Sequence, residues 1–294
     1  MSDDAALTAP PTVAAVTALA VACTDVDGVG PFGGHVLAAL GRRGNTRFLA
    51  LTDGDELTAL AVLPPDDPAE LAVHPAARGR GLGARLLRDA LDAGVSVWAH
   101  GDLPAARALA HRFTLRISRE LIQMRRPAAD PLPAVELPAG VTIRTFVPGR
   151  DDAAFLAVNA RAFSWHPEQG RLDQTGLDLE MAQPWFDPAG FFLAVDATDR
   201  LLGYHWTKVH AVDPTPIDRR GPPGPLGEVY VLGVDPESPV RGLGTPLTVA
   251  GLDYLRERGP ADVTLYVEGD NDRALRLYQR LGFTRFLTDV VYTR

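Results

Sequence analysis

The sequence predicts an α/β protein of the α+β layered kind, built from two tandem domains that each have a mixed central sheet flanked by helices. The chain has 294 residues, about twice the roughly 150 residues of a typical domain. One phrase occurs twice, LAVHPAARGRGLG from Leu71 and LGVDPESPVRGLG from Leu232, and the copies align without a gap at an offset of 161 residues. In both halves a hairpin precedes alternating strands and helices, which is typical of layered domains.

The first half is predicted to start with helices and a hairpin. Apolar periodicity and turn residues predict a helix at 11–24, a short helix at 36–41, a hairpin at 47–65, a strand at 69–75, a helix at 81–94, a strand at 95–100, a helix at 103–113 and a strand at 115–126. The proline-rich segment 126–140 predicts a linker. We therefore expect an N-terminal domain at 1–139 and a C-terminal domain at 140–294.

The second half repeats this order more completely. It is predicted to contain a strand at 141–146, a helix at 151–163, a hairpin at 191–210, a strand at 227–235, a helix at 242–259, a strand at 263–269, a helix at 271–282 and a strand at 283–293. Gly259 is expected to end its helix, because glycine adopts the left-handed backbone conformation common at helix C-termini. The proline- and glycine-rich segment 213–227 predicts a surface loop.

The composition favours a soluble protein with a small-molecule ligand. A formal net charge of −8 argues against nucleic acid or an anionic membrane as the main partner. The acidic N-terminus and the lack of a long apolar run predict no signal peptide and no membrane span, so we expect a cytoplasmic protein, and a monomer. The single cysteine, Cys23, lies in an apolar run and is expected to be a buried small hydrophobe. Lys208 is the only lysine.

Each copy of the repeated phrase predicts an anion-binding loop. An apolar strand is followed by Arg-Gly-Leu-Gly, led by Arg80 or Arg241, at the start of a helix. Glycines allow close backbone approach, and the free N–H groups of a first helical turn attract a pyrophosphate. The dinucleotide fingerprint needs a third glycine that both copies lack, and the P-loop needs a lysine that neither has.

Motifs beyond this loop resemble those of a known protein family. The order of strand, R-G-x-G, helix, strand and an Asn-led helix ending in Tyr-x-x-x-Gly-Phe resembles the acetyl-CoA-binding core of the GNAT N-acetyltransferase superfamily; here the last part reads LYVEGDNDRALRLYQRLGF. The runs ELIQMRRP, HPEQG, WFDP, GYHWTKVH and GEVYVLGVDP resemble the mycothiol synthase family, tandem GNAT enzymes of actinobacteria. The resemblance covers nearly the whole chain after about residue 20.

The resemblance implies acetyl-CoA as co-substrate and acetylation of the cysteinyl amine of desacetyl-mycothiol, a cysteinyl-glucosaminyl-inositol, by direct transfer in a ternary complex. It implies cofactor contacts at Leu71, Ala72, Val73, Gly79, Arg80, Gly81, Leu82, Gly83 and Ala84 in the first half. In the second half it implies cofactor contacts at Leu232, Gly233, Val234, Pro239, Val240, Arg241, Gly242, Leu243, Gly244, Thr245, Asn271, Asp272, Arg273, Ala274, Leu275 and Arg276. The implied substrate contacts are Glu168, Lys208, Glu228 and Tyr266. Gly34 stands where the family has a further acidic contact, which puts that contact in doubt or shifts it to His35.

Amine acetylation requires a base, an oxyanion site and an acid for the leaving thiolate. Glu228 precedes the strand expected to line the cofactor and is the candidate base. A backbone N–H near Val234 is the candidate oxyanion donor. Tyr278, seven residues after Asn271 and on one helix face, is the candidate acid, with a core aromatic residue as the structural alternative.

The first half is predicted to bind acetyl-CoA without catalysis. Alignment places Leu103 opposite Asn271 and Ala110 opposite Tyr278, so the candidate acid is missing. Asp67 aligns with Glu228 but lies in the turn-like PPDDPAE.

Two rival functions remain as alternatives, and a metal site was also considered. The chain could acetylate another small amine or a peptide, or act as a non-enzymatic acyl-CoA sensor; HPEQG and HWTKVH argue against the first, and the set Glu228, Asn271 and Tyr278 against the second. His166, His205 and His210 match no metal motif, and His205 and His210 are expected on opposite faces of a strand, so we expect no metal.

Overall fold

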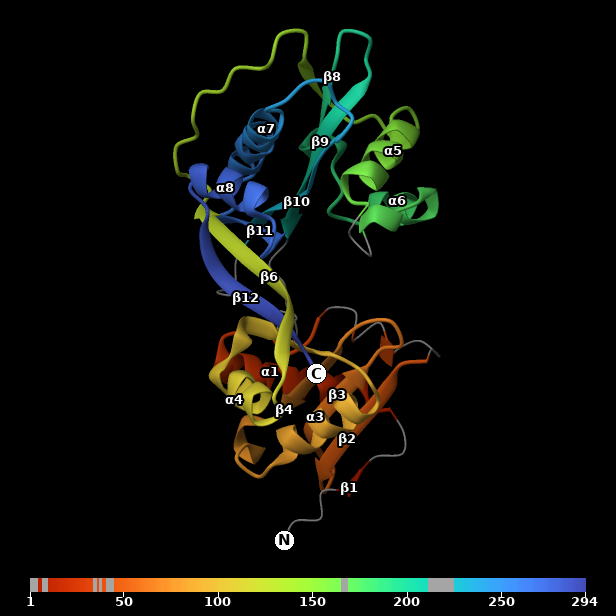
Figure 1. The fold of residues 1–294 in the computed structure, drawn as a ribbon, viewed down its shortest axis with the longest axis vertical. Helices are drawn as coiled ribbons and strands as arrows, with labels where there is room; N and C mark the ends of the chain where they lie inside the picture. The colour runs from red at the N-terminus through yellow and green to blue at the C-terminus, as the bar shows by residue number, and fades with distance from the viewer. Residues whose placement is uncertain are drawn as a thin grey trace.

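The computed structural model describes residues 5–6, 10–33, 36, 39–40, 45–164, 169–210 and 225–294. Its strands form one 12-stranded mixed sheet in the order β1-β2-β3-β4-β5-β12-β6-β11-β10-β9-β8-β7 (Figure 1). The strands are β1 (Ala5–Ala6), β2 (Arg47–Asp53), β3 (Glu56–Leu63), β4 (Ala69–Val73), β5 (Val97–Ala99), β6 (Arg116–Pro127), β7 (Thr142–Thr145), β8 (Phe191–Val195), β9 (Leu201–His210), β10 (Leu226–Val234), β11 (Asp262–Glu268) and β12 (Thr284–Thr293). The helices are α1 (Val13–Asp27), α3 (Leu82–Asp92), α4 (Pro104–Arg112), α5 (Asp152–Ala162), α6 (Gln174–Met181), α7 (Gly244–Glu257) and α8 (Asp272–Arg280).

The predicted fold class is confirmed, and the elements follow the predicted order. Gly259 has a φ of 78° directly after α7 and its C-cap residue, as expected for a helix end. The sequence did not predict α6, and β6 continues through Pro127, two residues into the predicted linker. The predicted helix at 36–41 and the predicted loop at 213–227 lie largely outside the described residues.

Helices cover both faces of each half of the sheet. Successive residues on β3 point to opposite faces: Leu60 and Val62 pack against α1, whereas Ala59 and Ala61 pack against α3. In the second half, α7 and α8 pack on the face formed by β6, β10 and β11, and α5 and α6 pack on the other face over β8 and β9. Within the described helices, none is long and apolar enough to cross a membrane.

The two halves exchange their last strands. The chain ends with β12, which pairs with β5 of the first half and with β6. β6, the last strand of the first half of the sequence, pairs with β11 of the second half from Leu121 to Pro127. In Figure 1 these two long strands connect the halves. The predicted boundary between residues 139 and 140 stays a prediction, because strands from each side of it complete the sheet on the other.

A buried polar cluster fixes the chain end to the first half. His100 Nε2 lies 2.8 Å from Glu70 Oε1, and His100 Nδ1 lies 3.1 Å from Asp289 Oδ2 on β12. The Gly33 N–H donates to both oxygens of Glu70, and the Gly101 N–H donates to Asp289. The ring thus connects a carboxylate on β4 with a carboxylate on β12.

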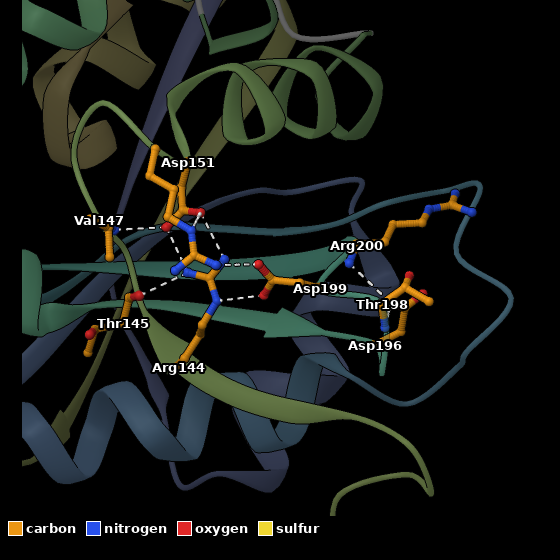
Figure 2. A network of polar contacts seen from close by, with 9 residues as sticks. Arg144, Thr145, Val147, Asp151, Asp196, Thr198, Asp199 and Arg200 are labelled. Carbon is orange, nitrogen blue, oxygen red and sulfur yellow. Dashed lines mark hydrogen bonds and ion pairs between the residues drawn. The ribbon is translucent and has the colours of Figure 1, made fainter.

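A second polar cluster fixes the first strand of the second half (Figure 2). Arg144 on β7 donates to both oxygens of Asp151 at 2.7 and 2.8 Å and to Asp199 at 2.9 Å. The Arg144 hydrogen bonds lower the pKa of Asp151, and the Val147 N–H assists. Asp151 is the N-cap residue of α5 but makes no side-chain capping bond; its carboxylate binds Arg144 on β7, and Arg144 in turn binds Asp199 in the turn between β8 and β9.

We expect His100→Ala to lower the free energy of unfolding by about 3–5 kcal/mol, because it leaves two buried carboxylates facing each other. Arg294→Ala is the matched control, since the exposed Arg294–Asp92 pair at 2.9 Å also connects the chain end to the first half. Its loss should cost less than about 1 kcal/mol. Urea denaturation measures both, and equal small losses would contradict the role of the cluster.

We expect a fragment of residues 140–294 to lack cooperative unfolding, because β11 and β12 lose the strand that lies between them. A fragment of residues 116–294 retains β6 and should unfold cooperatively. Circular dichroism during thermal unfolding compares the two. Equal cooperativity would show that the second half folds without the strand from the first.

Candidate active site

The site lies where two parallel strands separate. Pairing between β10 and β11 ends at Glu228 opposite Thr264, while β10 continues to Val234. The Asp235 N–H donates to Leu202 on β9 at 2.9 Å, and amide direction alternates along a strand. The N–H and C=O of Val234 therefore point away from β9, into the opening beside β11.

The first half repeats this geometry. β4 pairs with β5 only at Ala69 and Glu70, and β4 then continues to Val73. The His74 N–H donates to Thr58 on β3 at 2.8 Å, just as the equivalent Asp235 does on β9. The backbone of Val73 therefore points into an opening of its own.

The predicted anion-binding loops follow both openings. Gly79, Gly81 and Gly242 have φ values of 77°, 86° and 80°, which only glycine adopts readily. Gly81 and Leu243 are the N-caps of α3 and α7, and they carry no polar side chain. The first N–H groups of both helices are thus available to a bound anion.

In the first half the opening and the loop border a cavity of about 650 Å³. Every cofactor residue predicted there lines it except Arg80, whose guanidinium lies 3.7 Å from Asp53. The opposite wall carries Trp98, His100 and the start of α4. Cys23 also lines this cavity, where burial raises the pKa of its thiol, so it is no activated nucleophile.

In the second half the predicted cofactor residues occupy three adjoining segments. Leu232, Gly233 and Val234 end β10, and Pro239–Thr245 form the loop and the start of α7. Asn271 is the N-cap of α8, and Asp272–Arg276 form its first turns. The Asn271 side chain accepts the Ala274 N–H at 3.1 Å, a capping role that the sequence did not predict.

Glu228 is buried at the point where the strands separate, with 8% of its surface exposed. Its carboxylate oxygen Oε2 lies 2.5 Å from Nε2 of His210. Directly paired residues share a face, so Glu228 belongs to a polar row across five strands. The row consists of Lys208, Glu228, Thr264, Arg125 and Thr284.

Lys208 lies opposite Glu228 but points to aromatic rings. Its ammonium nitrogen lies 4.4 Å from the ring centre of Trp185 and 5.0 Å from that of Tyr230. Tyr230 sits at a β-bulge, since register shifts between Val229 and Val231. Burial, and then the negative charges of Glu180 and Glu228, raise the pKa of the Tyr230 phenol.

Tyr278 packs in the core under α8, edge-on to Phe283, with 7% of its surface exposed. Burial raises the pKa of its phenol, which keeps the proton on the oxygen at neutral pH. The structure therefore gives Tyr278 the packing of a core aromatic residue and the protonation state that an acid requires. Its role as the acid stays a prediction.

Tyr266 is 41% exposed and pairs in register with Gln123 on β6. Gln123 is buried and donates to Thr264 at 3.0 Å, while its Oε1 has no partner within the described residues. Gln123 thus joins the same face as Glu228, through a strand from the first half of the sequence. Glu168, Gly34 and His35 lie outside the described residues.

His205 and His210 lie on opposite faces of β9, as expected. His205 is buried and bonds the Leu247 carbonyl at 2.8 Å, and burial lowers its pKa to about 4. His210 lies on the opposite face of β9, against Glu228. His166 lies outside the described residues, and no cluster of three metal-binding side chains forms among those inside. That the chain binds no metal stays a prediction.

The first half differs at each position equivalent to the candidate acid and base. Asp67 is exposed in the turn before β4, and Ala110 is buried where the second half has Tyr278. Leu103 caps α4 without a polar side chain. Its lack of catalysis stays a prediction.

The sequence indicated no substrate-site role for His210, Tyr230, Trp185 or Gln123. All four lie within runs already noted; GYHWTKVH ends at His210, WFDP begins at Trp185, and ELIQMRRP contains Gln123. Tyr230 lies in GEVYVLGVDP, but the bulge that displaces its register was not visible in the strand pattern.

Comparison with known proteins relates this geometry to characterised families. The model of the acetyltransferase (GNAT) family matches residues 28–113 and 158–283. A protein of Thermobispora bispora named mycothiol acetyltransferase is 55% identical over 287 residues, which is 95% of each chain. One of Rhodococcus jostii with the same name is 48% identical and covers 95% of this chain and 93% of its own.

Solved structures agree with the tandem fold. A GCN5-related N-acetyltransferase from Sphaerobacter thermophilus superposes with a TM-score of 0.70 at 26% identity, covering 96% of this chain and 93% of its own. A tandem GNAT protein from the clavulanic acid biosynthesis pathway superposes with a TM-score of 0.66 at 20% identity, covering 99% and 97%.

We expect Gly242→Ala to weaken acetyl-CoA binding, because a side chain at a φ of 80° distorts the anion-binding loop. Gly259→Ala is the matched control: its φ is 78°, an added Cβ there also meets nothing within 4 Å, and it lies at the far end of α7. Both should lose about 1–2 kcal/mol of stability. Calorimetric titration should detect weaker binding only for Gly242→Ala; equal affinities would contradict the assignment.

Proposed function

We propose that this chain, which belongs to the acetyltransferase (GNAT) family and within it to the mycothiol acetyltransferases, acetylates the cysteinyl amine of desacetyl-mycothiol with acetyl-CoA. The observation that carries the proposal is identity of 55% over 95% of both chains with a mycothiol acetyltransferase. The buried carboxylate at the opening between β10 and β11 supports it. Direct transfer within a ternary complex is the simplest mechanism for these groups.

The strand opening and the loop after it fit acetyl-CoA. When bound, acetyl-CoA supplies the acetyl group as a thioester. The backbone groups of Leu232 and Val234, which face away from β9, can pair with its amide-containing arm. The N–H groups at the start of α7, with Arg241, can hold its phosphates. The Val234 N–H faces the opening and can stabilise negative charge on the acetyl oxygen.

Glu228 acts as the base. An α-amino group ordinarily has a pKa of about 7.7–8.0, so the carboxylate has only to accept one proton as the amine attacks. Its burial keeps water from competing for the same position. Tyr278 then supplies the proton that the leaving thiolate needs.

The acceptor lies on the polar face that carries Glu228. Lys208 and Tyr266 contact its hydroxyl groups, and Glu168 supplies a further contact from the segment before α6. Gln123 adds a buried polar side chain on the same face, with no partner for its Oε1 among the described residues. The first half binds acetyl-CoA in its own cavity without turnover, and the protein acts as a cytoplasmic monomer without a metal.

The direct test is incubation of the protein with acetyl-CoA and desacetyl-mycothiol, with detection of the acetylated product by mass. A parallel incubation with an aminoglycoside and a peptide amine examines other acceptors. Product from desacetyl-mycothiol alone supports the proposal. Release of CoA only with another amine would replace it, and binding without turnover would indicate a sensor.

We expect Glu228→Gln to lower kcat about 10²–10⁴-fold with little change in acetyl-CoA affinity, because the amide cannot take the proton. Glu257→Gln, an exposed carboxylate at the end of α7, is the control and should behave like the wild type. Steady-state kinetics with each substrate varied separates the two. A wild-type kcat for Glu228→Gln would remove its role as the base.

A further inference from the structure

Two basic side chains on β9 flank Glu228, and only one of them contacts it. Lys208 is its direct register partner, yet within the described chain no ion pair joins Lys208 to Glu228. The ammonium lies instead over Trp185 and Tyr230. An ammonium bonded to Glu228 would stabilise the ionised carboxylate and weaken it as a base. Because the Lys208 ammonium lies over the aromatic rings, the basic side chain that contacts Glu228 is the other one on β9.

That neighbour is His210, whose Nε2 lies 2.5 Å from Glu228 Oε2. The pair is unevenly exposed: the side chain of His210 is 37% accessible and that of Glu228 is 10%. The imidazole therefore lies between the buried carboxylate and solvent. Imidazole is the side chain that ordinarily exchanges protons near neutral pH.

We propose that His210 is a positioning residue for Glu228 and a relay that carries the substrate proton from that carboxylate to water. The inference rests on the proposed function, since it assumes that Glu228 accepts a proton from an amine. It assigns a role to a histidine for which the sequence indicated none.

The relay moves one proton from the amine to water. The amine N–H proton passes to one oxygen of Glu228 as the new N–C bond to the acetyl carbon forms. The carboxyl group then rotates so that its protonated oxygen faces His210, and it passes this proton to Nε2 of a ring that carries its own hydrogen on Nδ1. The Nδ1 hydrogen then leaves to water, and a return to the starting tautomer completes the cycle. No other reactant is required.

The hydrogen bond also fixes the base. A carboxylate held at Oε2 presents its other oxygen in one orientation. This lowers the entropic cost of a productive contact with the amine. The groups that face the pair from the surrounding strands and from α6 are Lys208, Tyr230, Asp262, Arg125 and Glu180. Of these, Lys208 and Arg125 have their charges over aromatic rings, 4.4 Å from Trp185 and 3.9 Å from Phe286.

The test uses His210→Gln, which retains a hydrogen-bonding side chain but cannot relay a proton, and His210→Ala. His111→Gln, an exposed histidine on α4, is the control. We expect His210→Gln to lower kcat for desacetyl-mycothiol about tenfold or more, while KM for acetyl-CoA and the unfolding midpoint stay unchanged. This loss is smaller than the ~10²–10⁴-fold effect of removing the acid–base group itself. Between roughly pH 5 and 8 the variant should also show a flatter rate profile than the wild type.

Two further measurements separate a relay from a structural contact. Added imidazole should restore part of the lost rate of His210→Ala, and His210→Gln should cost little more in a Glu228→Gln background, because both act on one proton path. Wild-type kcat and pH profile in His210→Gln would overturn the relay alone. A wild-type protein that does not acetylate desacetyl-mycothiol would overturn the proposed function and the relay with it.

Discussion

The backbone ladder between β6 and β12 joins the two halves into one sheet, and the other arrangements in the molecule depend on it. β12 is placed against β5 by this ladder, which brings Asp289 to His100 and closes the buried cluster with Glu70. β6 is placed against β11, which brings Gln123 and Arg125 beside the residues that follow Glu228 across the sheet. The candidate acceptor face is thus built from both halves of the sequence, although the candidate base belongs to only one.

The same backbone geometry serves two unequal sites. In each half, two parallel strands separate after a few pairs and leave one strand without a neighbouring strand on that side, beside a glycine loop. The side chains around the openings then decide the chemistry. The second opening has the buried Glu228 with His210 at its start, whereas the first has the Glu70–His100 pair, whose hydrogen-bonding capacity is already taken by Gly33 and Asp289. A carboxylate and an imidazole occur at both, but the second pair is more exposed: the side chains of His210 and Glu228 are 37% and 10% accessible, against 10% and 2% for His100 and Glu70.

Local patterns predicted the elements well because the determinants are local: periodicity for α7, a positive-φ glycine for its end, and the repeated phrase for both loops. The strand exchange was not predictable, since nothing in FTRFLTDVVYT states which of several apolar strands it pairs with. Glu228 was expected just before the strand that lines the cofactor, but it lies within that strand as the third residue of β10. Its contact with His210 depends on the register of β9 against β10. The bulge that aims Tyr230 at Lys208 is likewise a property of paired strands and not of either sequence alone.

The position of β12 has a consequence for synthesis. β12, which lies between β5 and β6, leaves the ribosome more than 150 residues after β6. Ribosomes add about 5–20 residues per second, so the first half waits on the order of ten seconds with an edge of β5 unpaired. Exposed strand edges recruit other chains. The nascent protein therefore passes through a stage in which its first half is nearly complete but has an unpaired strand edge, and the emergence of β12 ends that stage.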